Sequence, residues 1–149
     1  AGREILLGTR ELIHETGRHE MASTVDAVKS LYAGFASGDV AAVLGALDPA
    51  IEWTEAEGFP YGGTYVGREA VLANVFMRLA TEWDGFAAVP SEYVCQGDTV
   101  VALGEYSGTF KATGKPFRAP FVHVWRSRGG ALVRFRQHTD TAIVQAALR

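Results

Sequence analysis

The chain has little of several features that mark special classes of protein. It contains a single cysteine, Cys95, so it cannot form an internal disulfide, and a reducing compartment such as the cytoplasm is expected. Lys and Arg number 14 against 17 Asp and Glu, a formal net charge of −3, and no basic run is present. Nucleic-acid binding needs clustered cations, so this class is excluded. The longest apolar runs span only a few residues, far below the ~20 that a membrane-spanning helix needs.

What is present is typical of one globular domain. The chain has 149 residues, of which 48% are hydrophobic and 21% charged, which argues against wholesale disorder. Residues 1–20 carry only a three-residue apolar run, Ile5 to Leu7, which is too short for a secretory signal. Because Met21 resembles a natural start, we expect an N-terminal extension or leader at 1–20 and one domain at 21–149.

The hydrophobic pattern changes period along the chain and predicts an α+β fold. Apolar residues recur at helical spacing over 25–35, 40–47 and 71–83, with a strand at 51–55 and a loop at 57–67 between the second and third helices. Four strand-like runs follow at 86–95, 99–111, 117–126 and 131–139, joined by short glycine-containing turns, before a last short helix capped by Thr139 or Asp140. We therefore expect three N-terminal helices packed on one face of a curved, mainly antiparallel sheet, a cone that encloses a pocket.

Strand alternation predicts which side chains face the pocket. On 133–139, Val133, Phe135, Gln137 and Thr139 share one face, whereas Arg134, Arg136 and His138 share the solvent face. By the same alternation Phe121, His123 and Trp125 share a face, as do Ile51, Trp53 and Glu55. Glu55 and His123 are thus expected on apolar, aromatic faces, where a polar group needs a reason to be.

Four segments together resemble one known family. They are Gly38-Asp39 after an amphipathic helix, LDPAIEWTE, YVGREAV and VHVWRSRGGALVRFRQHTDTA. Over residues 24–148 the chain is similar to the SnoaL-like branch of the nuclear transport factor 2-like superfamily, whose relatives include ketosteroid isomerases, polyketide cyclases, limonene epoxide hydrolases and scytalone dehydratases. The resemblance implies the cone fold, but this fold hosts both enzymes and non-catalytic modules.

The resemblance also implies roles for particular residues. Glu55 matches the general-base carboxylate of the isomerases, and His123 falls near their oxyanion donor. Gln137 falls where cyclases and epoxide hydrolases carry a catalytic Asp, yet Gln does not take up a proton at neutral pH. Gly104 and Tyr106 stand at the other two positions of the epoxide hydrolase Asp-Arg-Asp set. Tyr32 lies one residue beyond the position of the isomerase helix tyrosine.

The predicted catalytic residues are therefore Glu55 and His123. The predicted substrate-binding residues are Tyr32, Trp53, Tyr61, Phe76, Tyr106, Phe121, Phe135 and Gln137, with Tyr61 in GFPYGG as a lid aromatic over the mouth. No phosphate loop, dinucleotide motif or metal-ligand spacing occurs, so no cofactor and no metal are expected.

Three functions remain open from the sequence. The first is a cofactor-free acid–base enzyme of isomerase, cyclase or dehydratase type acting on a small hydrophobic, oxygenated molecule. The second is a non-catalytic binding or dimerisation module, and the third is an epoxide hydrolase-like enzyme. Structural roles are the alternative for each residue: Glu55 solvated at a strand end, and His123 and Gln137 as bonded core groups. A homodimer through the convex sheet face, where Val122 and Val124 lie, is also expected.

Overall fold

A computed structural model describes residues 17–19 and 24–149 of the chain. The predicted extension at 1–20, apart from residues 17–19, and the predicted start at Met21 lie outside the described residues.

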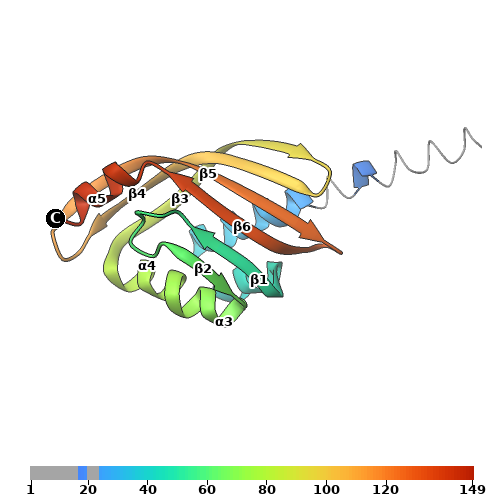
Figure 1. Ribbon diagram of the computed structural model, residues 1–149, viewed down its shortest axis with the longest axis horizontal. Coiled ribbons are helices and arrows are strands. Elements are labelled where there is room, and N and C mark those ends of the chain that lie inside the picture. The colour runs from blue at the N-terminus through green and yellow to red at the C-terminus, as the bar shows by residue number, and fades with distance from the viewer. Residues whose placement is uncertain (1–16, 20–23) are drawn as a thin grey trace, which may run out of the picture.

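The described residues form helices packed against one strongly curved sheet. Figure 1 shows the long strands arching over the N-terminal helices and the helices that follow β2. In chain order the elements are a helix over 24–37, α2 (Val40–Ala46), β1 (Leu47–Glu55), β2 (Gly63–Val66), α3 (Arg68–Val71), the π-helical turn η1 (Leu72–Phe76), α4 (Met77–Glu82), β3 (Trp83–Gln96), β4 (Thr99–Phe110), β5 (Lys115–Arg128), β6 (Ala131–Thr139) and α5 (Thr141–Ala147). The predicted α+β class is confirmed.

The sheet has the strand order β2-β1-β6-β5-β4-β3. Strands β3 to β6 form an antiparallel meander, as their short turns predict, and β2 is antiparallel to β1. The β1–β6 pair is parallel, with Trp53 opposite Phe135. This pair joins the N-terminal half of the chain to its last strand and brings the carboxyl end of β1, where Glu55 lies, beside the inward-facing residues of β6.

Two predicted boundaries are wrong for identifiable reasons. Strand β1 begins at Leu47, which was predicted to close the second helix; Leu47 is fully buried and pairs with Leu132 of β6. The predicted loop at 57–67 contains β2, a four-residue strand that is mostly exposed and therefore lacks the apolar alternation by which strands are recognised.

The third helix is present but interrupted. It passes through η1 and ends at Glu82, because Trp83 adopts an extended conformation and begins β3. Single π-turns inside helices occur frequently at functional sites. Here Phe76, the last residue of η1, lines the interior cavity.

The predicted facing of the two central strands is confirmed with one exception. Phe135 and Gln137 are buried, whereas Arg134, Arg136 and His138 are exposed. Val133 was predicted to be on the inner face, but it is only partly buried, so this prediction is wrong. The ladder shifts register between Arg126 and Ser127, and this irregularity places Leu132, fully buried, in the core instead.

Within the described ranges no helix is long and apolar enough to cross a membrane.

Candidate functional site

The interior of the cone holds a small cavity between the concave face of the sheet and the helices. Its volume is about 40 Å³, and its walls come from the first helix, η1, α4 and all strands except β2. The lining residues are Leu31, Tyr32, Phe35, Trp53, Glu55, Phe59, Val75, Phe76, Leu79, Phe86, Ala88, Tyr106, His123, Trp125, Phe135 and Gln137. The expected pocket is present between the helices and the concave face, but its volume is far below the roughly 300–1,000 Å³ of pockets that hold drug-sized ligands.

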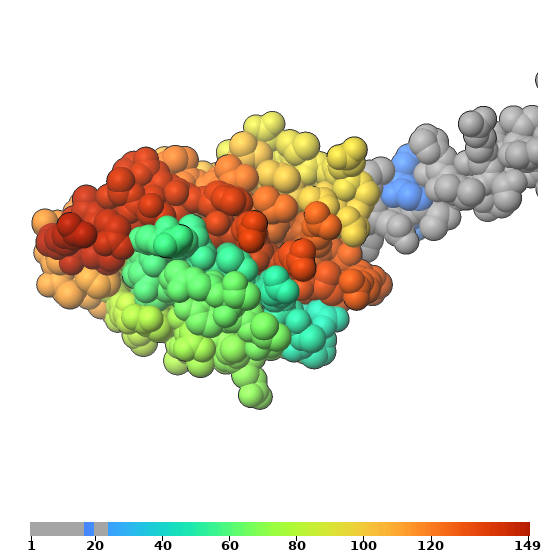
Figure 2. Space-filling model, viewed as in Figure 1, coloured from blue at the N-terminus to red at the C-terminus, as the bar shows by residue number. Residues whose placement is uncertain are grey.

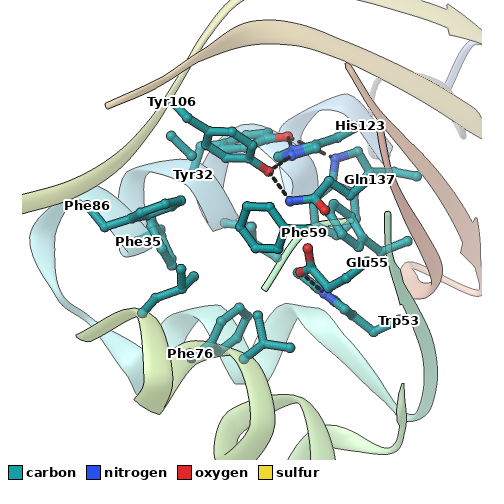
Figure 3. A pocket seen from close by; sticks show the side chains of 16 residues that line it. Tyr32, Phe35, Trp53, Glu55, Phe59, Phe76, Phe86, Tyr106, His123 and Gln137 are labelled. Carbon is teal, nitrogen blue, oxygen red and sulfur yellow. Dashed lines mark hydrogen bonds between the residues drawn. The ribbon is translucent and has the colours of Figure 1, made fainter. Parts of the chain in front are cut away.

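Figure 3 shows the cavity divided by chemistry. Polar groups of Tyr32, Tyr106, His123 and Gln137 gather on one side, with Glu55 close by. The rings of Phe35, Phe76 and Phe86 lie on the other side. From the direction of Figure 2, β2, α3 and the final strands close over this interior.

Glu55 is an ionisable group in an apolar enclosure. It is the last residue of β1, and the alternation of that strand turns its side chain inward, where it is 4% exposed. Trp53, two residues earlier on the same face, donates from Nε1 to Glu55 Oε1 at 2.7 Å. Glu55 Oε2 is buried and has no hydrogen-bond partner among the described residues. A buried polar atom without a partner in a cavity is the expected signature of a group that meets a ligand.

This enclosure changes the acidity of Glu55. Burial penalises the charged carboxylate and raises the pKa of Glu55 from 4.5 to about 7, although the Trp53 hydrogen bond acts in the opposite direction. A carboxyl group with a pKa near neutrality exchanges a proton readily at physiological pH.

His123 lies at the centre of a hydrogen-bonded network opposite Glu55. Its Nδ1 lies 2.6 Å from Tyr32 Oη, and its Nε2 is hydrogen-bonded to Tyr106 Oη. Burial lowers the pKa of His123 well below 6.5, so the ring is neutral. Both ring nitrogens are thus engaged by phenols, and His123 has no free donor for a substrate oxygen, contrary to the role predicted for it.

Gln137 completes the network. Its Oε1 accepts from the backbone N–H of Ala56 at 3.0 Å, directly after β1, and its Nε2 donates to Tyr106 Oη at 2.9 Å. Gln137 thereby ties the end of β1 to the phenol of β4. Burial raises the pKa of Tyr106 well above 10, and the charge of Glu55 adds to this rise.

Most predicted site residues line the cavity: Glu55, His123, Tyr32, Trp53, Phe76, Tyr106, Phe135 and Gln137. Tyr61 and Phe121 are not among the lining residues of the described chain. Tyr61 is not a lid, because it is buried and donates from Oη to Glu82 Oε2 at 2.6 Å while accepting from Trp83 Nε1 at 3.0 Å. Those bonds fasten the loop after β1 to α4 and β3.

Phe121 supports the site from behind. Its ring stacks on His123 with a centroid distance of 4.0 Å and is nearly parallel to it. The position of the Phe121 ring depends on Gly104, because a Cβ at residue 104 would lie 2.5 Å from that ring and 2.3 Å from the carbonyl oxygen of Val89. The glycine at this position is therefore required by packing.

Several lining residues were not predicted from the sequence, among them Phe35, Phe59, Phe86 and Trp125. Trp125 shares its strand face with His123, so its parity was a usable signal. Phe59 lies in the loop between β1 and β2, where no periodicity indicates the direction of a side chain.

A second depression adjoins the cavity on its apolar side. It has a volume of about 290 Å³ and extends from the end of the first helix and α2 to the start of β3. Four side chains line both spaces: Phe35, Phe76, Leu79 and Phe86. They form an apolar partition, which we call the phenylalanine partition, between the outer depression and the polar inner cavity.

The described residues contain no group of three or more His, Cys, Asp or Glu side chains that could hold a metal ion. The polar groups that line the cavity are the carboxyl, phenol, imidazole and amide groups named above.

The described residues thus form a cone-shaped α+β domain with a small interior pocket, lined by a buried carboxyl group and a phenol–imidazole network. The SnoaL-like domain family matches residues 28–135, and the chain belongs to that family, within the nuclear transport factor 2-like (NTF2-like) superfamily.

Solved structures agree with this assignment. An NTF2-like protein from Burkholderia thailandensis E264 is 43% identical, with 85% of this chain and 97% of that chain covered and a TM-score of 0.82. An NTF2-like protein of unknown function from Burkholderia pseudomallei K96243 is 31% identical, with coverages of 84% and 96% and a TM-score of 0.78. TerC, co-crystallized with polyporic acid, is 28% identical, with coverages of 85% and 98% and a TM-score of 0.77. No curated protein matches the chain.

Proposed function

We propose that this protein is a cofactor-free acid–base enzyme, of isomerase, cyclase or dehydratase type, that acts on a small hydrophobic, oxygenated molecule. The observation that carries the proposal is Glu55: a carboxyl group buried in an apolar cavity, with one oxygen unpartnered among the described residues and a pKa raised to about 7. Holding such a group in an apolar site costs stability, and a purely structural role does not require it.

The reaction proceeds by proton transfer. The Glu55 carboxylate removes a proton from a carbon next to a carbonyl group, the C–H electron pair forms a carbon–carbon double bond, and the carbonyl π electrons move to oxygen. A hydrogen-bond donor of the polar network stabilises the resulting enolate. Return of the proton from Glu55 to another carbon of a conjugated enolate gives an isomer. Alternatively, a hydroxyl group on the β-carbon takes up the proton from Glu55 and leaves as water while the enolate electrons form the carbon–carbon double bond, which gives dehydration.

We propose that a substrate reaches Glu55 past the phenylalanine partition, whose side chains line both the cavity and the outer depression. The inner cavity, of about 40 Å³, is far smaller than the roughly 300–1,000 Å³ of pockets that hold drug-sized ligands. Rotation of the Phe76 or Phe86 ring joins it to the outer depression, which is wide and apolar enough for the body of a hydrophobic substrate. The co-crystal of TerC with polyporic acid supports small-molecule binding by a relative of this chain.

A binding module without turnover is the second candidate. The observation that favours it is Gln137, an amide engaged by Ala56 and Tyr106 where cyclases of this family carry an Asp. Hydrolysis of an epoxide is a weaker alternative, because Gln137 cannot activate a water molecule by taking its proton.

The test compares the two glutamates of β1 on a panel of enolisable cyclic ketones. Glu55→Gln keeps the shape and the Trp53 hydrogen bond but removes proton uptake, so turnover should fall by ~10²–10⁴ while binding persists. Glu52→Gln, on the outer face, is the matched control and should leave turnover unchanged. Equal turnover in wild type and Glu55→Gln would remove Glu55 from the mechanism, and binding without turnover in the wild type would establish the module instead.

The entry route has its own test. Phe76→Ala should increase the affinity for ketones with bulky apolar bodies, because it removes one ring of the partition. Met77→Ala, an exposed neighbour on α4, is the control. Unchanged affinity for bulky ligands in Phe76→Ala would show that substrates enter elsewhere.

We also propose that the protein pairs with a second copy through the outer face of the sheet. Two exposed valines on β3, Val89 and Val94, are 61% and 52% exposed. They lie next to β4, where Val94 pairs with Val101, and the outer valines of β5, Val122 and Val124, continue the apolar surface. Sedimentation at micromolar concentration should give twice the mass of the 16.0 kDa chain, and a monomer mass would refute the pairing.

The single cysteine supports a location in the cytoplasm.

A further inference from the structure

The polar network of the cavity is one continuous chain of hydrogen bonds. At one end the indole of Trp125 donates from Nε1 to Tyr32 Oη at 3.1 Å, and Tyr32 Oη lies 2.6 Å from His123 Nδ1. At the other end Gln137 donates from Nε2 to Tyr106 Oη at 2.9 Å, and Tyr106 Oη is hydrogen-bonded to His123 Nε2. All these bonds are buried.

At both ends of this hydrogen-bond network the donor and the acceptor are fixed by chemistry. An indole N–H can only donate, so Tyr32 accepts from Trp125. The Gln137 amide is oriented by the backbone N–H of Ala56, which must be met by Oε1, and this leaves Nε2 to face Tyr106. Each phenol oxygen therefore already accepts one hydrogen bond from its outer neighbour.

The central part of this hydrogen-bond network has one more hydrogen than it has hydrogen bonds to use it. A neutral imidazole carries one N–H and one acceptor nitrogen, so His123 donates to one phenol and accepts from the other. Tyr32, His123 and Tyr106 together supply three hydrogens, but only two bonds join them. One phenolic hydrogen is therefore left without an acceptor among the described side chains of the network.

The surroundings decide which phenol carries this hydrogen. A free hydrogen on Tyr32 would lie among aromatic rings, those of Tyr93, Phe121 and Trp125. A free hydrogen on Tyr106 faces the cavity that Glu55 also lines, where Glu55 Oε2 has no hydrogen-bond partner among the described residues. This one unpartnered acceptor favours the free hydrogen at Tyr106, which requires Tyr32 to donate to Nδ1 and His123 to donate from Nε2.

We propose that Tyr106 is the catalytic hydrogen-bond donor to the substrate oxygen, and that His123, as the Nε2–H tautomer, is a positioning residue that turns the Tyr106 hydrogen into the cavity. The role of Tyr106 rests on the proposed function, but the tautomer of His123 does not. A ligand that satisfies the site then has a carbonyl oxygen at Tyr106 and a removable proton at Glu55. A hydrocarbon of the same shape leaves the phenol unpaired and should bind roughly 10- to 100-fold more weakly.

The first experiment measures the tautomer on the intact chain. Long-range ¹H–¹⁵N correlation spectra of histidine-labelled protein at pH 8, assigned with His123→Asn, distinguish the two ring nitrogens. The expected pattern is a protonated Nε2 and an unprotonated Nδ1 for His123. A protonated Nδ1 would overturn the proposal, because Tyr106 Oη would then donate its hydrogen to His123 Nε2 and could not donate to a substrate.

The second experiment tests the donor with two probes of one shape, cyclohex-2-enone and cyclohexene, titrated into labelled protein. The wild type should prefer the enone roughly 10- to 100-fold, and Tyr106→Phe should lose that preference. Tyr93→Phe is the matched control, since it removes a phenol oxygen from β3 that does not belong to the network or line the cavity. Retention of the preference in Tyr106→Phe would overturn the donor role. Absence of binding of either probe to the wild type would refute both the donor role and the proposed function, while the tautomer result would stand by itself.

Discussion

The two faces of the sheet carry the same kinds of side chain in opposite surroundings. On β1, the side chain of Glu52 is 47% exposed on the outer face, with its carboxylate 3.6 Å from Arg134 Nε, whereas Glu55 is buried on the inner face beside Trp53. Similarly, His138 is exposed on the outer face, whereas His123 is buried on the inner face. The difference arises from strand parity alone, because successive residues of a strand point to opposite faces.

The comparison shows that chemistry in this domain depends on the face more than on the residue type. Outer charges are solvated and contribute little to stability. Inner polar groups have lost water and are hydrogen-bonded, and burial also shifts the pKa of the titratable groups Glu55 and His123.

The largest effect expected from this difference is on the pH dependence of stability. The folded protein binds the Glu55 proton more tightly than the unfolded chain does, so the free energy of unfolding should fall as pH rises from about 4.5 to about 7. At ~1.4 kcal/mol per pKa unit, the loss is about 3 kcal/mol, and it is complete above pH 7. Denaturant unfolding of Glu55→Gln should lack this loss, whereas Glu52→Gln should keep it.

His123 contributes with the opposite sign, since its lowered pKa removes stability as pH falls below 6.5. The Glu55 effect is therefore read from the difference between wild type and Glu55→Gln, in which the His123 contribution cancels. A difference that is constant between pH 4.5 and 8 would contradict the raised pKa.

A smaller effect is expected for the buried amide. Gln137→Leu leaves the Ala56 N–H without its acceptor and removes a donor to Tyr106, which should cost about 1–3 kcal/mol of unfolding free energy. His138→Leu, the next residue on the opposite face, should change stability by less than about 0.5 kcal/mol. Equal costs at the two positions, measured by urea denaturation, would erase the distinction between the faces.

The smallest effect concerns the outer ion pair. The Glu52–Arg134 pair is half exposed on both sides, so a double-mutant cycle with Glu52→Gln and Arg134→Gln should give a coupling below about 1 kcal/mol. The coupling should disappear in high salt. A salt-resistant coupling of several kcal/mol would mean that the outer face is desolvated.

Strand periodicity explains how much of the site was predictable. The inward direction of Glu55, His123 and Gln137 follows from a two-residue repeat that the ladder enforces along each strand. Val133 breaks the rule because the register shift at Ser127 inserts an irregularity that no alternation in the sequence indicates. Strand β2 escaped prediction because it is short and mostly exposed.

The features that sequence could not supply depend on distant contacts. The Tyr32–His123 bond joins residues 91 positions apart, and its partners are fixed by how the first helix lies on the sheet. The small volume of the cavity results from packing of rings that come from separate elements, such as Phe35 against Phe76 at 5.9 Å between centroids. Such packing is decided by tertiary geometry and not by any local pattern.

The central claim, that Glu55 is a buried base poised near neutral pH, is tested most directly by its own titration. The side-chain carboxyl ¹³C shift of Glu55, assigned with Glu55→Gln in glutamate-labelled protein, can be followed from pH 3 to pH 9 with Glu52 as the internal reference. The account predicts a midpoint near pH 7 for Glu55. A Glu55 midpoint near 4.5 would contradict it, because the carboxyl group would then be solvated and no longer poised to exchange a proton at neutral pH.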